Sequence, residues 1–78
     1  MNHAKRPIIE PTRVYSREEV VEILNVSLST VKRMIASGQL RASQPAGMRR
    51  IFITGQAILD LLENSQIDPK TYVDPDDE

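Results

Sequence analysis

Two short amphipathic helical patterns, separated by only a few residues, constrain what this chain can fold into. In the first pattern, apolar residues at positions 20, 21, 23 and 24 recur at spacings of three and four, which places them on one face of a helix. Ser16 can cap the start of this helix, and Glu19, three residues on, completes a capping box. The pattern predicts a helix that opens after Ser16 and ends near Asn25.

The second helical pattern follows after a tight connection formed by Val26 and Ser27. Ser27 can cap a helix from Leu28 to about Ser37, and Gly38 can supply the left-handed residue that ends it. Apolar residues at positions 28, 31, 34 and 35 lie on one side of this helix, opposite a polar side. Two short helices joined by so few residues make a helix-turn-helix.

A β-hairpin pattern and a third helical pattern follow the helix-turn-helix. Residues 40–44 and 51–54 are typical of strands, and the Pro and Gly within residues 45–50 favour a loop between them. Thr54 can cap a helix that ends near Asn64 and has an inner apolar stripe at positions 58, 59, 61 and 62. The expected fold is mainly α with a small β-hairpin. It is a compact winged helix-turn-helix in the order helix, helix, two-stranded wing, helix.

The length of 78 residues allows one domain at most. We expect residues 1–13, which hold two prolines and three basic residues, to form a mobile N-terminal arm. Residues 14–64 contain all the helical and strand patterns and form the domain. Residues 65–78 are polar, with two prolines and closely spaced acids, so we expect a disordered acidic tail.

Charge is distributed unevenly along the chain, although the net charge is only −1. No Asp or Glu occurs from Ser27 to Leu59, whereas this stretch holds five Lys and Arg residues. Residues 68–78 hold five acidic residues and one lysine. A clustered basic stretch is the pattern of a nucleic-acid contact surface. A charge run on its own is equally consistent with a solvated face.

Several classes of protein find no support in the composition. The chain has no Cys, so neither a disulfide nor a thiolate metal site can reinforce it. Its apolar runs are too short to span a bilayer, and no apolar segment follows the N-terminus as in a signal peptide, so a cytoplasmic protein is expected. No nucleophile–base pair, metal-ligand spacing or phosphate loop is visible. We therefore expect no enzymatic activity, cofactor, metal or small-molecule substrate.

The run from Tyr15 to Leu62 resembles the excisionase-type DNA-binding domain, a compact MerR-like winged helix. Each matching piece is weak alone, but five pieces occur in order at the right spacing. They are the opening Tyr15–Val20, the turn and second helix Leu24–Val31, the exit Ile35–Leu40, the wing Gly47–Ile51 and the third helix Ala57–Leu62.

The chain departs from this family at a few positions. Asn25 stands where the family usually has Gly, an aromatic or other residue is common where Lys32 stands, and many members have a Trp near the end of the third helix that this chain lacks. Members of the family include excisionases of phages and integrative elements, AlpA-like regulators and the DNA-binding domains of terminase small subunits. The resemblance alone does not choose among these subfamilies.

In a fold of this kind, the second helix reads DNA. Arg33, one turn after Ser29 on the polar side, is the best candidate to bond a guanine bidentately, and Lys32 is expected to meet a phosphate. The remaining candidates are hydroxyls, which can reach phosphates or base edges: Ser27, Ser29, Thr30 and Ser37. For Ser27, capping is the favoured alternative, and Ser29 and Thr30 are alternatively plain solvated residues.

The wing is the expected second contact with DNA. Arg49 and Arg50 follow Gly47, and Arg41 lies on the partner strand. Arginine suits a narrow minor groove, where the potential is more negative. The alternative is that the hairpin tip is merely polar. Tyr15 either packs beneath the first helix, which we favour, or donates to a phosphate.

These observations predict a sequence-specific protein that binds double-stranded DNA. The favoured role is a recombination directionality factor, an excisionase that binds repeated sites, bends DNA and promotes excision by a site-specific integrase. One alternative is a small AlpA-like transcriptional regulator, and another is a protein-interaction module that does not bind DNA. MerR-type regulators dimerise through a long helix after this domain, and only sixteen residues follow Leu62. We expect a monomer whose copies bind side by side on DNA.

Overall fold

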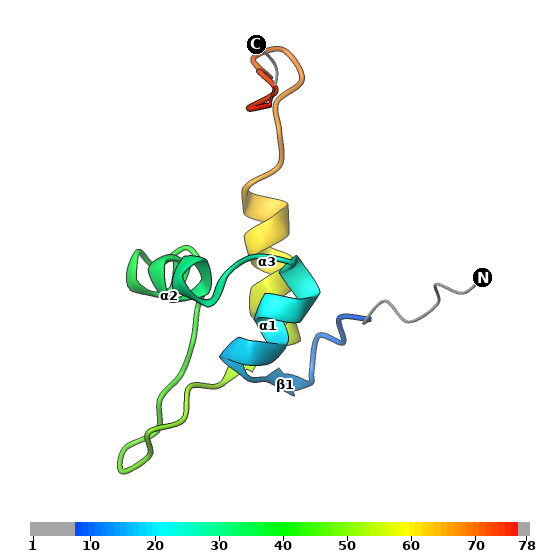
Figure 1. Ribbon diagram of the computed structural model, residues 1–78. Helices are drawn as coiled ribbons and strands as arrows, with labels where there is room; N and C mark the ends of the chain where they lie inside the picture. Colours follow the sequence, from blue (N-terminus) through cyan, green and yellow to red (C-terminus); the bar gives the residue numbers. More distant parts are fainter. Residues whose placement is uncertain (1–7, 77–78) are drawn as a thin grey trace, which may run out of the picture.

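Within residues 8–76, three helices and a two-stranded sheet make up the domain. The computed structural model describes residues 8–76 and is shown in Figure 1. This architecture confirms the expected fold class, small and mainly α. The elements follow in the order β1 Val14–Tyr15, α1 Arg17–Leu24, α2 Leu28–Ala36, β2 Ile53–Thr54 and α3 Gly55–Asn64.

Hydroxyl side chains cap all three helices, as the sequence predicts. At α1, Ser16 Oγ accepts from Glu19 N at 3.1 Å while Ser16 N donates to Glu19 Oε1 at 2.8 Å, which completes the capping box. Ser27 caps α2, and Thr54 caps α3. Asn25 ends α1 in the left-handed conformation, with φ 56°, so the chain reverses direction directly before α2.

The sheet forms between different segments from those expected. β1 pairs antiparallel with β2, with Val14 opposite Thr54 and Tyr15 opposite Ile53. The two limbs of the wing, expected to be strands over 40–44 and 51–54, are joined by one antiparallel bridge between Ser43 and Phe52. Each backbone N of that bridge lies 2.8 Å from the other residue's carbonyl oxygen.

Burial of the core explains this pairing. Ile53 is fully buried and Tyr15 is 3% exposed, so the chain beyond Phe52 runs alongside β1 and inserts both side chains into the core. The wing residues 44–50, by contrast, are all exposed, and none of them packs in the core. The sheet therefore lies at the base of the wing and not along it.

The core draws one or more side chains from each helix and from the sheet. Its fully buried members are Val20 of α1, Val31 of α2, Leu40, Ile53 of β2 and Ile58 of α3. In α3 the predicted inner stripe is buried at Ile58 and Leu61, whereas Leu62 is 46% exposed. The last turn of α3 therefore extends past the layer formed by α1 and α2 (Figure 1).

Residues 8–13, part of the expected N-terminal arm, contact the domain, and mobility of the arm stays a prediction. Gly55 N donates to the Arg13 carbonyl at 2.9 Å, and Gln56 N donates to the Pro11 carbonyl at 3.0 Å. These two bonds satisfy amides in the first turn of α3 that have no partner within the helix. Residues 1–7, the remainder of the predicted arm, lie outside the described residues.

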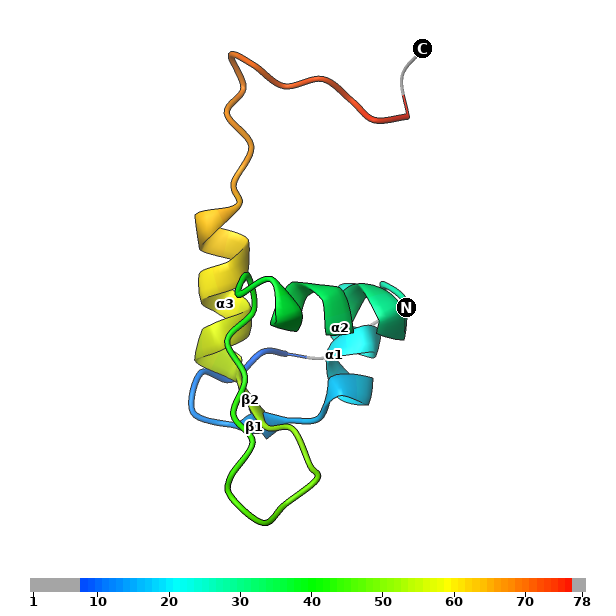
Figure 2. The same cartoon turned by 90° about the vertical axis from the view of Figure 1, so that its left-hand side faces the viewer.

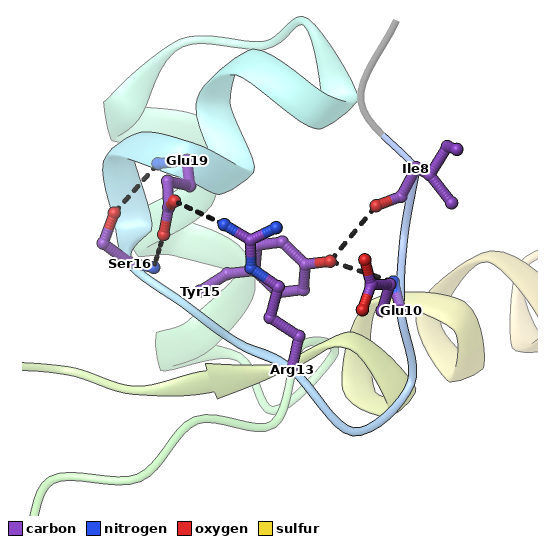
Figure 3. A network of polar contacts seen from close by, with 6 residues as sticks. All are labelled: Ile8, Glu10, Arg13, Tyr15, Ser16 and Glu19. Carbon is purple, nitrogen blue, oxygen red and sulfur yellow. Dashed lines mark hydrogen bonds and ion pairs between the residues drawn. The ribbon is translucent and has the colours of Figure 1, made fainter.

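The hydroxyl of Tyr15 holds the same N-terminal segment (Figure 3). It accepts from Glu10 N at 2.9 Å and donates to the Ile8 carbonyl at 3.2 Å. Ile9, next to both, packs against the core. The ring of Tyr15 is in the core, as favoured from the sequence, and its hydroxyl is used within the domain.

Gly55 marks the tightest approach of this segment to α3. A Cβ built on Gly55 would lie 1.9 Å from the Glu10 carbonyl oxygen and 2.6 Å from the carbonyl carbon. Real Cβ atoms do not approach backbone so closely, so a side chain here would displace the segment. The lack of a side chain at Gly55 is therefore what allows residues 8–13 to cross the start of α3.

Residues 65–76 leave the end of α3 and extend away from the domain (Figures 1 and 2). They contain turns but no helix or strand, and all of them are exposed, including Ile67 and Val73 at 64% and 79%. Disorder of this acidic tail stays a prediction, and residues 77–78 lie outside the described part. None of the helices within residues 8–76 is long and apolar enough to cross a membrane.

Candidate nucleic-acid interface

The outer face of α2 is exposed and basic. Val31 is fully buried and Leu28 and Ile35 are partly buried, so the helix packs on the core along this side. Ser29, Lys32 and Arg33 lie around the opposite side of the helix and are exposed. Within residues 8–76, neither Lys32 nor Arg33 makes an ion pair. Both charges are therefore available to a ligand that approaches α2.

Three of the four candidate hydroxyls on α2 and at its ends make hydrogen bonds within the protein. Ser27 Oγ accepts from Thr30 N at 3.1 Å and lies 2.9 Å from Thr30 Oγ1. Ser37 Oγ donates to the Met34 carbonyl at 3.2 Å. These bonds fit the alternative in which Ser27 caps the helix. DNA contacts by all four hydroxyls stay predictions, and Ser29 makes no side-chain hydrogen bond among the described residues.

The wing presents its arginines from a tight turn. Met48 N donates to the Pro45 carbonyl at 3.1 Å, and Gly47, the third residue of this turn, has a φ of 82° that suits glycine. Arg49 follows the turn and is exposed. The Arg50 guanidinium lies 5.7 Å from the centre of the Phe52 ring, so a residue at the base of the wing orients it.

The wing and α2 project from the same side of the domain. Figure 1 shows both on the left, and Figure 2, which views that side, shows α2 above the loop of the wing. The tail and the N-terminal segment leave in other directions. A major groove admits one α-helix. A duplex that received α2 would therefore pass beside the wing.

Arg41 is placed differently from the other basic candidates. Its guanidinium pairs with the Asp60 carboxylate on α3, which also accepts from Gln56 Nε2 at 2.9 Å. Asp60 stands one residue beyond the acid-free stretch 27–59, so the sequence pattern did not reveal this partner. The ion pair ties the first limb of the wing to α3, and contact of Arg41 with DNA stays a prediction.

Arg17 is a basic residue at this surface that the sequence analysis did not single out. It begins α1 directly after the cap Ser16, and it lines a groove shared with Arg49 and Arg50 of the wing. In the sequence it looks like an ordinary first-turn residue of an amphipathic helix. The signal that distinguishes it is spatial, because the wing arginines are more than thirty positions away.

A second hollow lies between residues 8–13 and α1. Arg13 crosses the Tyr15 ring at 5.2 Å from its centre and lies 3.9 Å from Glu19 Oε2 (Figure 3). Glu10 and Glu22 also line this hollow. Three carboxylates against one guanidinium make it unsuited to phosphate, so it is not part of the candidate interface.

Comparison with known proteins gives one family. Residues 14–66 match a helix-turn-helix domain family, the excisionase-like one, and this match covers more than half of the chain. No curated protein and no solved structure matches the chain.

Proposed function

The chain belongs to the excisionase-like family of helix-turn-helix domains, and on that premise we propose that it binds double-stranded DNA sequence-specifically with α2 in the major groove. A helix-turn-helix domain implies DNA binding. In this proposal Arg33 reads a guanine through two hydrogen bonds, while Ser29 and Lys32 contact neighbouring phosphates. The wing arginines meet the backbone or minor groove beside α2.

The observation that supports this proposal best is the shared side of α2 and the wing (Figures 1 and 2). Every charged residue from 27 to 59 is basic, and this stretch includes all of α2 and the wing. Among residues 8–76, the acid that forms an ion pair with this stretch, Asp60, is bound to Arg41 and not to Arg33, Arg49 or Arg50. A surface of one charge sign, borne on a helix and a loop that project together, favours a polyanion over a mixed protein surface.

The role we propose for this binding is that of an excisionase. The support comes from the family and from the acidic tail, which rises from the end of α3 and extends away from the domain (Figures 1 and 2). A tail in that position is free to contact a basic patch of a site-specific integrase or of the next copy on DNA. Transcriptional regulation of the AlpA kind is the competing outcome of the same test.

The binding proposal is tested with Arg33→Ala. The DNA site is first selected from random duplexes with the full chain, and Kd is then measured on that site and on each point variant of it. We expect the variant to bind the selected site more weakly by roughly 1–3 kcal/mol, about 5- to 150-fold in Kd. We also expect it to lose its preference at one base pair, so that changing this pair no longer alters the Kd of the variant. Lys70→Ala, which removes a charge from the exposed tail, is the control and should change nothing beyond a small charge effect.

Two results would contradict this assignment. An equal loss on all sequences would show that Arg33 contacts a phosphate. A failure to select any duplex, even at low salt, would favour the protein-interaction module. The excisionase role is tested separately, by adding the chain to a site-specific integrase whose recombination sites contain the selected duplex. Stimulated excision supports the role, whereas altered transcription from the bound promoter with unchanged excision supports the regulator.

A further inference from the structure

We propose that the start of α1 and the wing form a single phosphate-binding groove, and that Arg17 is a DNA-contacting residue within it. The ligand is a phosphodiester segment of the duplex backbone. This inference rests on the proposed DNA binding, and it assigns a contact to a helix other than the recognition helix. In this proposal the wing arginines and Arg17 bind the same phosphodiester segment and act as one site.

The groove has two walls that are distant in the sequence. Ser16, Arg17 and Glu18, at the start of α1, form one wall, and residues 49–51 of the returning limb of the wing form the other. Arg17 is partly buried in this groove, whereas Arg49 and Arg50 are exposed at its edge. The fold therefore brings three arginines from two elements to one concave surface.

The charges of the groove are uncompensated apart from Glu18. Among residues 8–76, none of the three arginines makes an ion pair. The other acid of the first turn, Glu19, is turned to a different side, because its carboxylate accepts from Ser16 N and lies near Arg13 (Figure 3). Three guanidinium groups against one carboxylate leave a net positive groove.

The arginines, and not the helix end alone, make this site. The capping box already satisfies the amides of Ser16 and Glu19, so few free N–H groups remain there. Guanidinium groups bind phosphate through two parallel hydrogen bonds. An arginine side chain also loses less conformational entropy per hydrogen bond than a lysine side chain does. The Phe52 ring orients one of them, Arg50, before any ligand arrives.

The groove also lies where a DNA backbone would run. In both views the first turn of α1 lies below α2 and above the tip of the wing, and Figure 1 shows it set back from both toward the body of the domain (Figures 1 and 2). A duplex that holds α2 in its major groove has a phosphate strand along each border of that groove. The strand on the wing side would cross the start of α1 before it reaches the wing, so Arg17 and the wing arginines would hold the same stretch.

The test is a set of affinity measurements on the full chain, with the selected duplex and with an unrelated duplex. Arg17→Ala should weaken both by the same factor, roughly 5- to 10-fold at 0.1 M salt, since a phosphate contact carries no sequence information. Arg49→Ala with Arg50→Ala should weaken both and flatten the salt dependence by about one unit per phosphate lost. The triple variant should depart from the product of these two effects by more than about threefold, because groups in one site are coupled.

Matched controls separate the groove from general charge and from folding. Arg13→Ala removes the same charge four positions from Arg17, but Arg13 lies against the Tyr15 ring, outside the groove. This variant should lose less than twofold in duplex affinity. Arg17→Gln repeats the test with an uncharged side chain that is longer than that of alanine. The melting temperature of each variant, compared with that of the parent, reports whether the variant is folded.

Three results would overturn the inference: an Arg17 variant that binds like the parent, a loss equal to that of Arg13→Ala, or strictly multiplicative effects in the triple variant. In each case the affinity of Arg33→Ala still tests whether α2 contacts DNA, so the proposed function is decided independently of this inference. Loss of all duplex binding in the unmodified chain would instead refute the proposed function.

Discussion

Replacing Gly55 with alanine tests the packing of the N-terminal segment. On the backbone alone this change should be neutral or slightly stabilising, because Gly55 begins α3 without a positive φ and alanine is the better helix former. The structure predicts the opposite sign. The new Cβ would lie 1.9 Å from the Glu10 carbonyl oxygen, so residues 8–13 must move off the start of α3.

The magnitude follows from the contacts that this movement breaks. Two backbone bonds, from Gly55 N to Arg13 and from Gln56 N to Pro11, and the two bonds of the Tyr15 hydroxyl are each worth about 1 kcal/mol. Breaking most of these bonds lowers the free energy of unfolding by about 3 kcal/mol, and the better helix propensity of alanine restores up to about 1 kcal/mol. The free energy of unfolding should therefore fall by about 2 kcal/mol. In a domain of this size that lowers the melting temperature by roughly 10 °C or more.

Thermal unfolding followed by circular dichroism measures this loss, and limited proteolysis locates it. Trypsin should cut after Arg13 faster in the variant than in the parent, because the segment that holds this bond has been displaced. Gly47→Ala is the control: its Cβ meets nothing within 4 Å, so only its φ of 82° opposes the change and Arg13 should stay protected. A Gly55→Ala protein as stable as the parent, with unchanged cleavage, would refute the reasoning.

Two further changes test the placement of Arg41 and of the tail. Arg41→Ala should reduce stability by less than about 1 kcal/mol, since its pair with Asp60 is solvent-exposed. A loss of duplex affinity like that of the Arg49→Ala, Arg50→Ala double variant would support the predicted DNA contact of Arg41, whereas a change of less than about twofold would limit Arg41 to its pair with Asp60. A chain ending at Asn64 should melt within a few degrees of the full chain and bind a single site equally well or slightly better at low salt, because residues 65–76 are all exposed and none belongs to the apolar core; the truncation removes the bond from the Ser65 hydroxyl to the Leu61 carbonyl. A large drop in melting temperature would contradict this, and lost binding of adjacent sites would support a partner role for the tail.

Local chemistry made the three helices predictable. Each begins at a hydroxyl cap that acts within three residues, and Asn25 ends the first helix through its own backbone conformation. The exposed face of α2 followed from the same reasoning, because helical periodicity fixes which side chains lie opposite Val31. These features depend on neighbours in the sequence, so the sequence alone contains the information.

Contacts between distant segments were not predictable in the same way. The bonds from Pro11 and Arg13 reach residues more than forty positions away, and a strand of two residues is too short to show any alternation. The pairing of Arg41 with Asp60 and the meeting of Arg17 with the wing likewise need the folded chain. The sequence therefore predicted that α2 and the wing form the candidate interface. It did not predict the pairing of Arg41 with Asp60 or the place of Arg17 beside the wing.

The single Ser43–Phe52 bridge has a consequence for how binding preference can change over evolutionary time. Residues 44–50 lie beyond that bridge and none of them belongs to the core, whereas Leu40 and Ile53, on either side of it, are buried there. Substitutions at the other positions of this tip would therefore be nearly silent for folding, whereas Gly47 is held to glycine by its φ of 82°. Mutational drift there is free to sample new arrangements of charge, so a lineage could acquire a different DNA target without first passing through an unstable intermediate.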